Sequence, residues 1–218
     1  MNVPIQFLCM VLLRLLNRRG ALAAVALALV CQGCLAVGTL SKASVTLDGI
    51  RRPEKDGWIE LPGIRLLFEA NNYQPRVVFL GPVPIPLPSS DDYRRAEFLI
   101  YVSFDPAEST FSITPGLIQL EIDDGPPLTP TMITGPRGVL MYSGPRYKCA
   151  GNGEAPPVDR TTSLPITERM CFSFSFDCPT PKASTDFRLT LLGLTKAGEK
   201  MLIPVQFEKR YQVILEGN

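Results

Sequence analysis

The heptapeptide CFSFSFD, at residues 171–177, alternates between aromatic and small polar side chains along its centre. Phe172, Phe174 and Phe176 recur at every second position, with serines between them. A period of two places successive side chains on opposite faces of an extended chain, so the three rings share one face. The stretch therefore predicts a strand of an antiparallel β-sheet with one buried face.

The same alternation recurs in AEFLIYVSF (96–104), LIQLEID (117–123) and DFRLTLL (186–192). Compact turn sequences separate such segments, and LTKAG (194–198) predicts a hairpin between its flanking strands. With roughly nine or ten strands and no amphipathic helix beyond the N-terminal signal helix, the pattern predicts an all-β, immunoglobulin-like antiparallel sandwich. The residues expected in its inner layer are Phe98, Ile100, Ile118, Leu120, Phe172, Phe174, Phe187 and Leu189.

Composition narrows the classes of function. The 218 residues include 21 prolines and 17 glycines, which suits short strands joined by turns. Beyond residue 33 the chain has 19 basic and 21 acidic residues and no basic block, so it offers no electrostatic footprint for nucleic acid. Histidine is absent, which removes the usual general base and the commonest metal ligand. We therefore expect no cofactor and no metal.

The N-terminal segment has the layout of an export signal. Three arginines within VLLRLLNRR (11–19) precede the uncharged, apolar stretch GALAAVALALV (20–30). A basic region, an apolar region of this length and then small residues are typical of a secretory signal. The alternative is a single membrane span that includes residues 11–16, which would bring the arginines into the bilayer core.

The apolar stretch ends in two cysteines, Cys31 and Cys34, with Gly33 directly before the second. This end resembles the lipobox of bacterial lipoproteins, although Cys31 stands where leucine is usual. The resemblance implies that Cys34 becomes the lipid-modified N-terminus, and Leu35 after it resembles lipoproteins released to the outer membrane. The alternative is that both cysteines are small apolar residues that end a signal helix.

These observations predict a signal peptide at 1–33, a lipidated tether at 34–44 and a single β-sandwich domain at 45–218. The expected location is the cell envelope, attached to the lipid bilayer through Cys34. The expected side is the periplasmic face of the outer membrane, with the cell surface as the alternative.

Three cysteines lie beyond the lipidated position, an odd number for an oxidising compartment. If 137–148 and 165–176 are paired strands around the long loop, Cys149 lies nearer Cys171 than Cys178. We therefore favour a Cys149–Cys171 disulfide, with Cys149–Cys178 as the rival and three free thiols as the remaining possibility.

Two segments interrupt the regular pattern. GPVPIPLPSSDDYRR (81–95) alternates prolines with aliphatic residues, which fits a polyproline-type ligand or an edge strip with its aliphatic side chains on the core. The long loop at 143–165 contains Arg146, Tyr147 and Lys148, a tyrosine between two cations. These three residues are candidate contacts for a protein partner, because arginine and tyrosine are common anchors, or they belong to a solvated loop.

No phosphate-binding glycine loop, nucleophile elbow or metal-ligand pair is present. The carboxylate pairs Asp91–Asp92 and Asp123–Asp124 fall in predicted turns, where aspartate is ordinary. The sequence therefore favours a non-enzymatic binding or adaptor module for another envelope protein. The alternatives are a binder of a small envelope ligand or an inhibitor of a host hydrolase, and a hydrolase that uses carboxylates alone.

Overall fold

The computed structural model describes residues 34–45, 57–72, 74–80, 83–86, 97–141, 147–149 and 156–216. The signal segment at 1–33 therefore lies outside the described residues. Contacts divide the chain into two compact units, one of Met1–Gly38, Pro75–Ser89 and Tyr211–Asn218, the other of Thr39–Gln74 and Ser90–Arg210. Residues of the region expected as a single β-sandwich domain, 45–218, fall in both units, and the single domain stays a prediction.

All regular elements in the described residues are strands. They are β1 (Cys34–Val45), β2 (Ile59–Leu61), β3 (Ile64–Ala70), β4 (Gln74–Leu80), β5 (Val83–Pro86), β6 (Glu97–Pro106), β7 (Phe111–Ile113), β8 (Ile118–Ile122), β9 (Met132–Arg137), β10 (Val139–Met141), β11 (Tyr147–Cys149), β12 (Leu164–Ile166), β13 (Met170–Pro179), β14 (Phe187–Lys196) and β15 (Glu199–Glu216).

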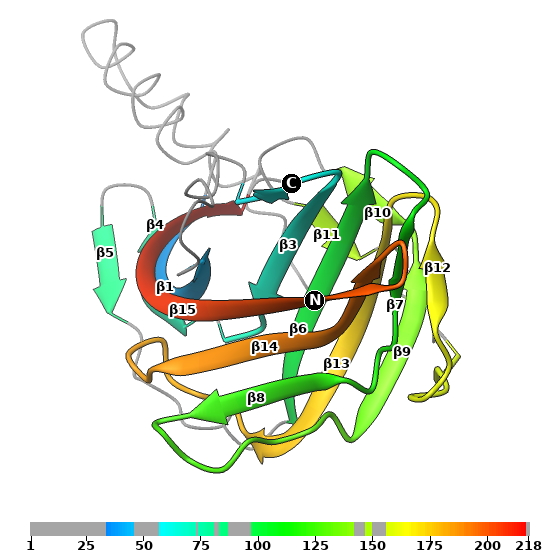
Figure 1. Ribbon diagram of the computed structural model, residues 1–218. Helices are drawn as coiled ribbons and strands as arrows, with labels where there is room; N and C mark the ends of the chain where they lie inside the picture. The colour runs from blue at the N-terminus through cyan, green and yellow to red at the C-terminus, as the bar shows by residue number, and fades with distance from the viewer. Residues whose placement is uncertain are drawn as a thin grey trace, which may run out of the picture. The chain divides into compact units, whose positions relative to one another are not determined.

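The larger unit contains an antiparallel sheet of eleven strands that is strongly curled (Figure 1). Its order is β12-β7-β14-β15-β1-β3-β6-β13-β9, with β2 beside β3 and β8 beside β14. The predicted all-β antiparallel class is confirmed. The described strands number more than the nine or ten expected, because β2, β7, β10, β11 and β12 have three residues each, too few for a period to be recognised.

The alternation seen in the sequence selects the core. Strand β13 pairs with β6 so that Phe172 lies opposite Val102, and Phe174 opposite Ile100. On β14, Leu189 lies opposite Leu120 of β8. All eight residues expected in the inner layer are buried, each no more than 1% exposed, so this prediction is confirmed.

One aromatic contact joins two strands that are not neighbours in the sheet. The rings of Phe98 on β6 and Phe187 on β14 meet edge to face, 5.4 Å between centroids. Phe187 also stacks on Phe207 of β15 at 4.5 Å. Since β15, β1 and β3 separate β14 from β6 in the strand order, the curl turns the two halves of the sheet face to face. In Figure 1, β8, β14 and β15 cross in front of β6 and β13.

The predicted hairpin at 194–198 is present. Strands β14 and β15 pair up to Lys196 opposite Glu199, and Ala197 and Gly198 between them both have positive φ, 51° and 86°. Two consecutive positive-φ residues are typical of the tight turns whose twist matches that of a β-hairpin. The turn predicted around Asp123 and Asp124 likewise has positive φ at both aspartates.

The tether expected at 34–44 is instead part of a strand. Thr39, Ser41 and Ala43 of β1 are buried, Lys42 between them is exposed, and Lys42 lies opposite Glu69 of β3. Small residues at every second position fit a crowded strand position, although a run of small and polar residues carries little hydrophobic signal. The described part of this segment is therefore a strand of the sheet, and its role as a lipidated tether stays a prediction.

The proline-rich segment contributes β5, which forms a hairpin with β4 in the smaller unit. Pro84 and Pro86 lie opposite Phe79 and Val77, at alternate positions of the ladder. This supports an edge strand, because proline is tolerated where its nitrogen need not donate to the neighbouring strand. The expectation that the aliphatic residues lie on the core is wrong for Ile85, which is 39% exposed. The rest of 81–95, apart from 83–86, lies outside the described residues.

Candidate functional site

A pocket of about 440 Å³ opens beside the hairpin of β2 and β3 in the larger unit. Its polar lining consists of Glu60, Arg65, Asp105 and Arg169. Leu61, Gly63, Ile64, Pro106 and Ala107 supply the remaining lining. A volume of this order lies within the usual range of small-molecule sites, roughly 300–1,000 Å³.

The register of three adjacent strands brings the polar residues together. Glu60 lies opposite Arg65 across the β2–β3 hairpin, and Arg65 lies opposite Asp105 on β6. Their neighbours Leu66 and Phe104 are fully buried in the core, so period two turns Arg65 and Asp105 to the outer face. The hairpin turn contains Gly63 with φ of +89°, a conformation that favours glycine.

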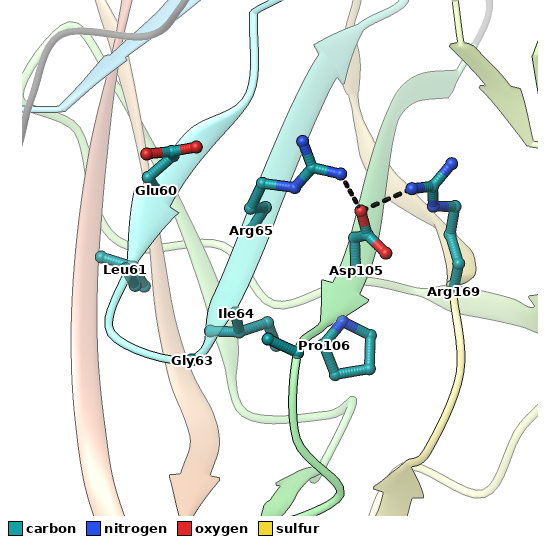
Figure 2. A pocket seen from close by; sticks show the side chains of 9 residues that line it. Glu60, Leu61, Gly63, Ile64, Arg65, Asp105, Pro106 and Arg169 are labelled. Carbon is teal, nitrogen blue, oxygen red and sulfur yellow. Dashed lines mark hydrogen bonds and ion pairs between the residues drawn. The ribbon is translucent and has the colours of Figure 1, made fainter.

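Asp105 binds both arginines through the same oxygen. Nη2 of Arg169 donates to Oδ2 of Asp105 at 2.6 Å, and Nη2 of Arg65 donates to that same atom. Figure 2 shows the two guanidinium groups approaching Asp105 from opposite sides. Burial opposes ionisation of this carboxyl, but the hydrogen bonds and positive charges of Arg169 and Arg65 outweigh it, so the pKa of Asp105 lies below 3.8.

Both guanidinium groups also lie against the ring of Trp58. Cζ of Arg65 is 5.4 Å and Cζ of Arg169 is 5.8 Å from the ring centroid. Trp58 is the single tryptophan of the chain and only 1% exposed. Cation–π contacts of this length favour the charged groups and restrict their movement.

The arrangement is suited to binding anions. Two guanidinium cations face one carboxylate, so Arg65, Asp105 and Arg169 together carry one positive charge in excess, which Glu60 balances in the pocket as a whole. Arginine does not lose its proton in proteins, and Asp105 with its lowered pKa is a weak base at neutral pH. The cluster can therefore attract and orient a negative group, whereas neither partner is suited to proton transfer near neutrality.

Within the described residues, no group of three or more histidine, cysteine, aspartate or glutamate side chains is placed to hold a metal ion. Among those same residues there is also no helix with the length and apolar character needed to cross a membrane.

The site residues expected from the sequence do not gather at this pocket. Cys34 is the first residue of β1, and its side chain is not among those described. Arg146 lies outside the described residues, while Tyr147 and Lys148 belong to β11 and pair with Met141 and Leu140 of β10. Lipidation of Cys34 and partner contact through 146–148 remain predictions.

Cys149 and Cys171 form a pair at disulfide distance, with 5.7 Å between their Cα atoms. The route to this pairing differs from the expected one. Arg137 of β9 lies opposite Cys171, and the chain continues into β10, where Val139 lies opposite Cys149. Two successive strand pairings therefore bring the cysteines together, rather than one long pair of strands around the loop.

Cys178 is a free cysteine, the one that the favoured pairing leaves over. Its side chain is partly buried and packs against the core. Burial, with the adjacent negative charge of Asp177, raises the pKa of the Cys178 thiol from 9.0 to about 11. A thiol of this kind is protonated at neutral pH and therefore a poor nucleophile.

The sequence did not single out Arg65, Asp105 or Arg169. The alternation in IRLLFEA (64–70) places Arg65 on the outer face, and Asp105 follows the alternating part of β6. These signals indicate exposure, and exposed charges are ordinary on a sheet. Convergence of the three residues depends on strand neighbours 40 and 64 positions apart, which local pattern does not specify.

Comparisons with protein-family models, with curated proteins and with solved structures find no match for this chain.

Proposed function

We propose that this protein is a membrane-tethered lipoprotein of a cell envelope that binds another envelope protein and performs no catalysis. The lipid on Cys34 would hold it to the bilayer, and residues 146–148 would contact the partner. Two observations support the proposal. The first is the resemblance of the N-terminal segment to a lipobox, and the second is the link between the β10–β11 hairpin and β13 through Cys149 and Cys171.

The main support for the partner site is that the β10–β11 hairpin is linked to a core strand. Strand β11 holds Tyr147 and Lys148 directly before Cys149, which pairs with Cys171 of β13. Cys171 is fully buried on a strand whose neighbouring residue, Phe172, is in the core. A hairpin joined covalently to a core strand loses little conformational entropy when a partner binds, which favours its use as a recognition surface.

The start of β1 supports a position close to the membrane. Thr39 is 2% exposed and belongs to the sheet of the larger unit, five residues after Cys34. Five extended residues reach at most roughly 17 Å. A lipid on Cys34 would therefore hold the domain nearer to the bilayer than a tether over the whole of 34–44 would allow. Partners would then have to lie close to the membrane.

For the domain itself, we propose an immunoglobulin-like sandwich as the finer description. It is supported by the contact between β6 and β14, whose aromatic side chains meet across one core. Sandwich domains of this kind bind partners through loops and hairpins that extend from a rigid scaffold.

The partner test is a pull-down of the tagged full chain from native membranes after crosslinking. We expect wild type to enrich an envelope protein, and a variant with Arg146→Ala, Tyr147→Ala and Lys148→Ala to lose it. A matched control replaces two exposed lysines and an exposed leucine elsewhere in the larger unit, Lys182→Ala, Lys200→Ala and Leu202→Ala. If wild type enriches no partner, the adaptor proposal is wrong, and if the triple variant at 146–148 keeps the partner, the site is misassigned.

The anchor is tested separately by membrane fractionation and intact-mass analysis. We expect wild type to carry a lipid mass on Cys34, and Cys34→Ser to leave the membrane fraction. A wild-type N-terminus without lipid, or a Cys34→Ser protein that remains in the membrane, would contradict lipid anchoring.

One observation favours a second candidate function, that of a small-ligand binder. The pocket at Arg65, Asp105 and Arg169 is of ligand size and places two guanidinium groups against a buried indole. It involves none of residues 146–148, so the two candidate functions can be tested independently.

A further inference from the structure

The pocket presents charges of opposite sign side by side. Arg65 and Glu60 occupy opposed positions of the β2–β3 hairpin, and both line the cavity. Directly opposed side chains in an antiparallel pair have Cβ atoms about 4.5–5.5 Å apart. A cationic and an anionic side chain therefore start from neighbouring positions and line the same pocket.

The positive side is able to accept an oxyanion. Arg65 uses one terminal nitrogen toward Asp105, and a guanidinium carries further N–H donors on its other two nitrogens. The Arg65 side chain is 38% exposed and that of Arg169 is 33% exposed, so both reach the cavity as well as Asp105. The fork of N–H donors on a guanidinium matches the two oxygens of a carboxylate.

The negative side is Glu60, which is exposed and makes no ion pair with another of the described residues. Its carboxylate is available to accept hydrogen bonds from a ligand ammonium group. The same charge repels a second anionic group, which disfavours dicarboxylates and phosphate dianions. Pro106 and Ala107 also line the pocket and provide apolar surface for a short aliphatic part of the ligand.

We propose that this pocket binds a small zwitterion, an α-amino acid or a short peptide, with its carboxylate on Arg65 and Arg169 and its ammonium group on Glu60. Asp105 is a positioning residue, because it accepts a hydrogen bond from each guanidinium group. The two guanidinium groups lie on opposite sides of its carboxylate (Figure 2). This inference rests on the second candidate function and is independent of the adaptor proposal.

The single tryptophan makes binding observable at the site. Trp58 lies against both guanidinium groups, so a ligand that engages them should change its fluorescence. The full chain in detergent is titrated with L-alanine, L-alanyl-L-alanine, N-acetyl-L-alanine and L-alaninamide. Equilibrium dialysis with labelled alanine and dialanine measures binding directly, in case the indole does not respond.

We expect saturable binding of alanine or dialanine, and at least about tenfold weaker binding of the compounds that lack one charge. Tighter binding of alanine would identify a free amino acid as the ligand type, and tighter binding of dialanine a peptide. Glu60→Gln should weaken binding of the zwitterions about tenfold and leave that of N-acetyl-L-alanine unchanged. Glu97→Gln, an exposed glutamate at the other end of β6, is the matched control and should change neither.

Three results would overturn the proposal. The first is no saturable binding of either zwitterion by dialysis up to about 50 mM, an affinity too weak for recognition. The second is alaninamide binding as tightly as alanine, which would exclude a role for the carboxylate. The third is unchanged affinity for alanine in Glu60→Gln, whose exposed position makes loss of folding an inadequate explanation.

Discussion

Replacing Phe187 by leucine should test whether the two halves of the sheet face each other. Phe187 is 1% exposed and touches two other rings, Phe98 edge to face at 5.4 Å and Phe207 stacked at 4.5 Å. Leucine keeps most of the volume, so the change removes mainly these ring contacts. Each is worth about 0.5–1.5 kcal/mol beyond buried area, which predicts a loss of about 1–3 kcal/mol in the free energy of unfolding.

Truncation to alanine adds the cost of a cavity. Phe187→Ala should lower the free energy of unfolding by about 3–5 kcal/mol, the range for buried phenylalanine. Leu202→Ala is the control, because Leu202 is 59% exposed and its truncation should change stability by no more than about 0.5 kcal/mol. The assay is urea denaturation followed by Trp58 fluorescence and far-UV circular dichroism, whose transitions must coincide for a two-state analysis.

A double-mutant cycle isolates the contact across the core. Phe98→Leu and Phe187→Leu are measured singly and together, and the coupling energy should be about 0.5–1.5 kcal/mol. β6 and β14 are not neighbours in the strand order, so such a coupling requires the curl of the sheet. A coupling below about 0.3 kcal/mol would show that the rings do not meet, and this account of the core would be refuted.

Replacing Cys149 and Cys171 together by serine should lower the free energy of unfolding by about 3 kcal/mol in the chain-entropy model, because the disulfide closes a loop between residues 22 positions apart. Cys178→Ser is the control and should not reproduce this loss in urea denaturation. The pKa of Asp105 lies below 3.8 in the folded protein, so the unfolded chain binds more protons just below that pH, and the free energy of unfolding should fall as the pH drops through 3.8. Asp105→Asn should flatten this part of the profile when urea midpoints are measured over a pH series. An unaltered profile would contradict the assignment. Burial raises the pKa of the Cys178 thiol from 9.0 to about 11, so iodoacetamide near pH 8 should label Cys178 about a hundredfold more slowly in the folded protein than in the urea-unfolded protein. Equal labelling rates would exclude a buried thiol. A Cβ at Gly193 would clash with the backbone carbonyl oxygen of Thr114, so Gly193→Ala should lower the free energy of unfolding by about 1–3 kcal/mol. An unchanged melting temperature would contradict this packing.

Local alternation was sufficient for the composition of the core. Phe172, Phe174 and Phe176 of CFSFSFD are buried, as are Ile118 and Leu120 of LIQLEID, and their period of two predicted this. The reason is that face selection in a strand depends only on position within that strand. The β14–β15 hairpin was equally accessible, because its turn residues Ala197 and Gly198 are adjacent in sequence.

Local alternation failed where a strand lacks large apolar residues or is very short. Thr39, Ser41 and Ala43 are buried in β1, but their small side chains resemble those of a linker. Their place in the sheet depends on pairing with β3, a neighbour more than twenty residues away along the chain. The three-residue strands are likewise stabilised by their partners rather than by a pattern of their own.

The cysteines lie between these two cases. Cys171 and Cys178 are poor partners for each other, because both lie on β13 and an extended strand holds them apart. The favoured partner of Cys149 agrees with the structure, yet the pairing arises through β9 and β10 rather than through the strands expected. A correct disulfide therefore did not require a correct strand register.

Residue order alone thus indicates the all-β class and the buried face of the strands that carry large apolar residues, and it contains an N-terminal segment that resembles the leaders of lipoproteins. These properties are local, because each depends on residues a few positions apart. The pocket is not local: Arg65, Asp105 and Arg169 come from distant segments and meet because β3 pairs with β6 in one register. A shift of that register by one residue would turn Arg65 or Asp105 to the opposite face and separate the cluster. The charge excess, the contact with Trp58 and the proposed ligand therefore all follow from how the strands assemble, which the alternation of side chains leaves open.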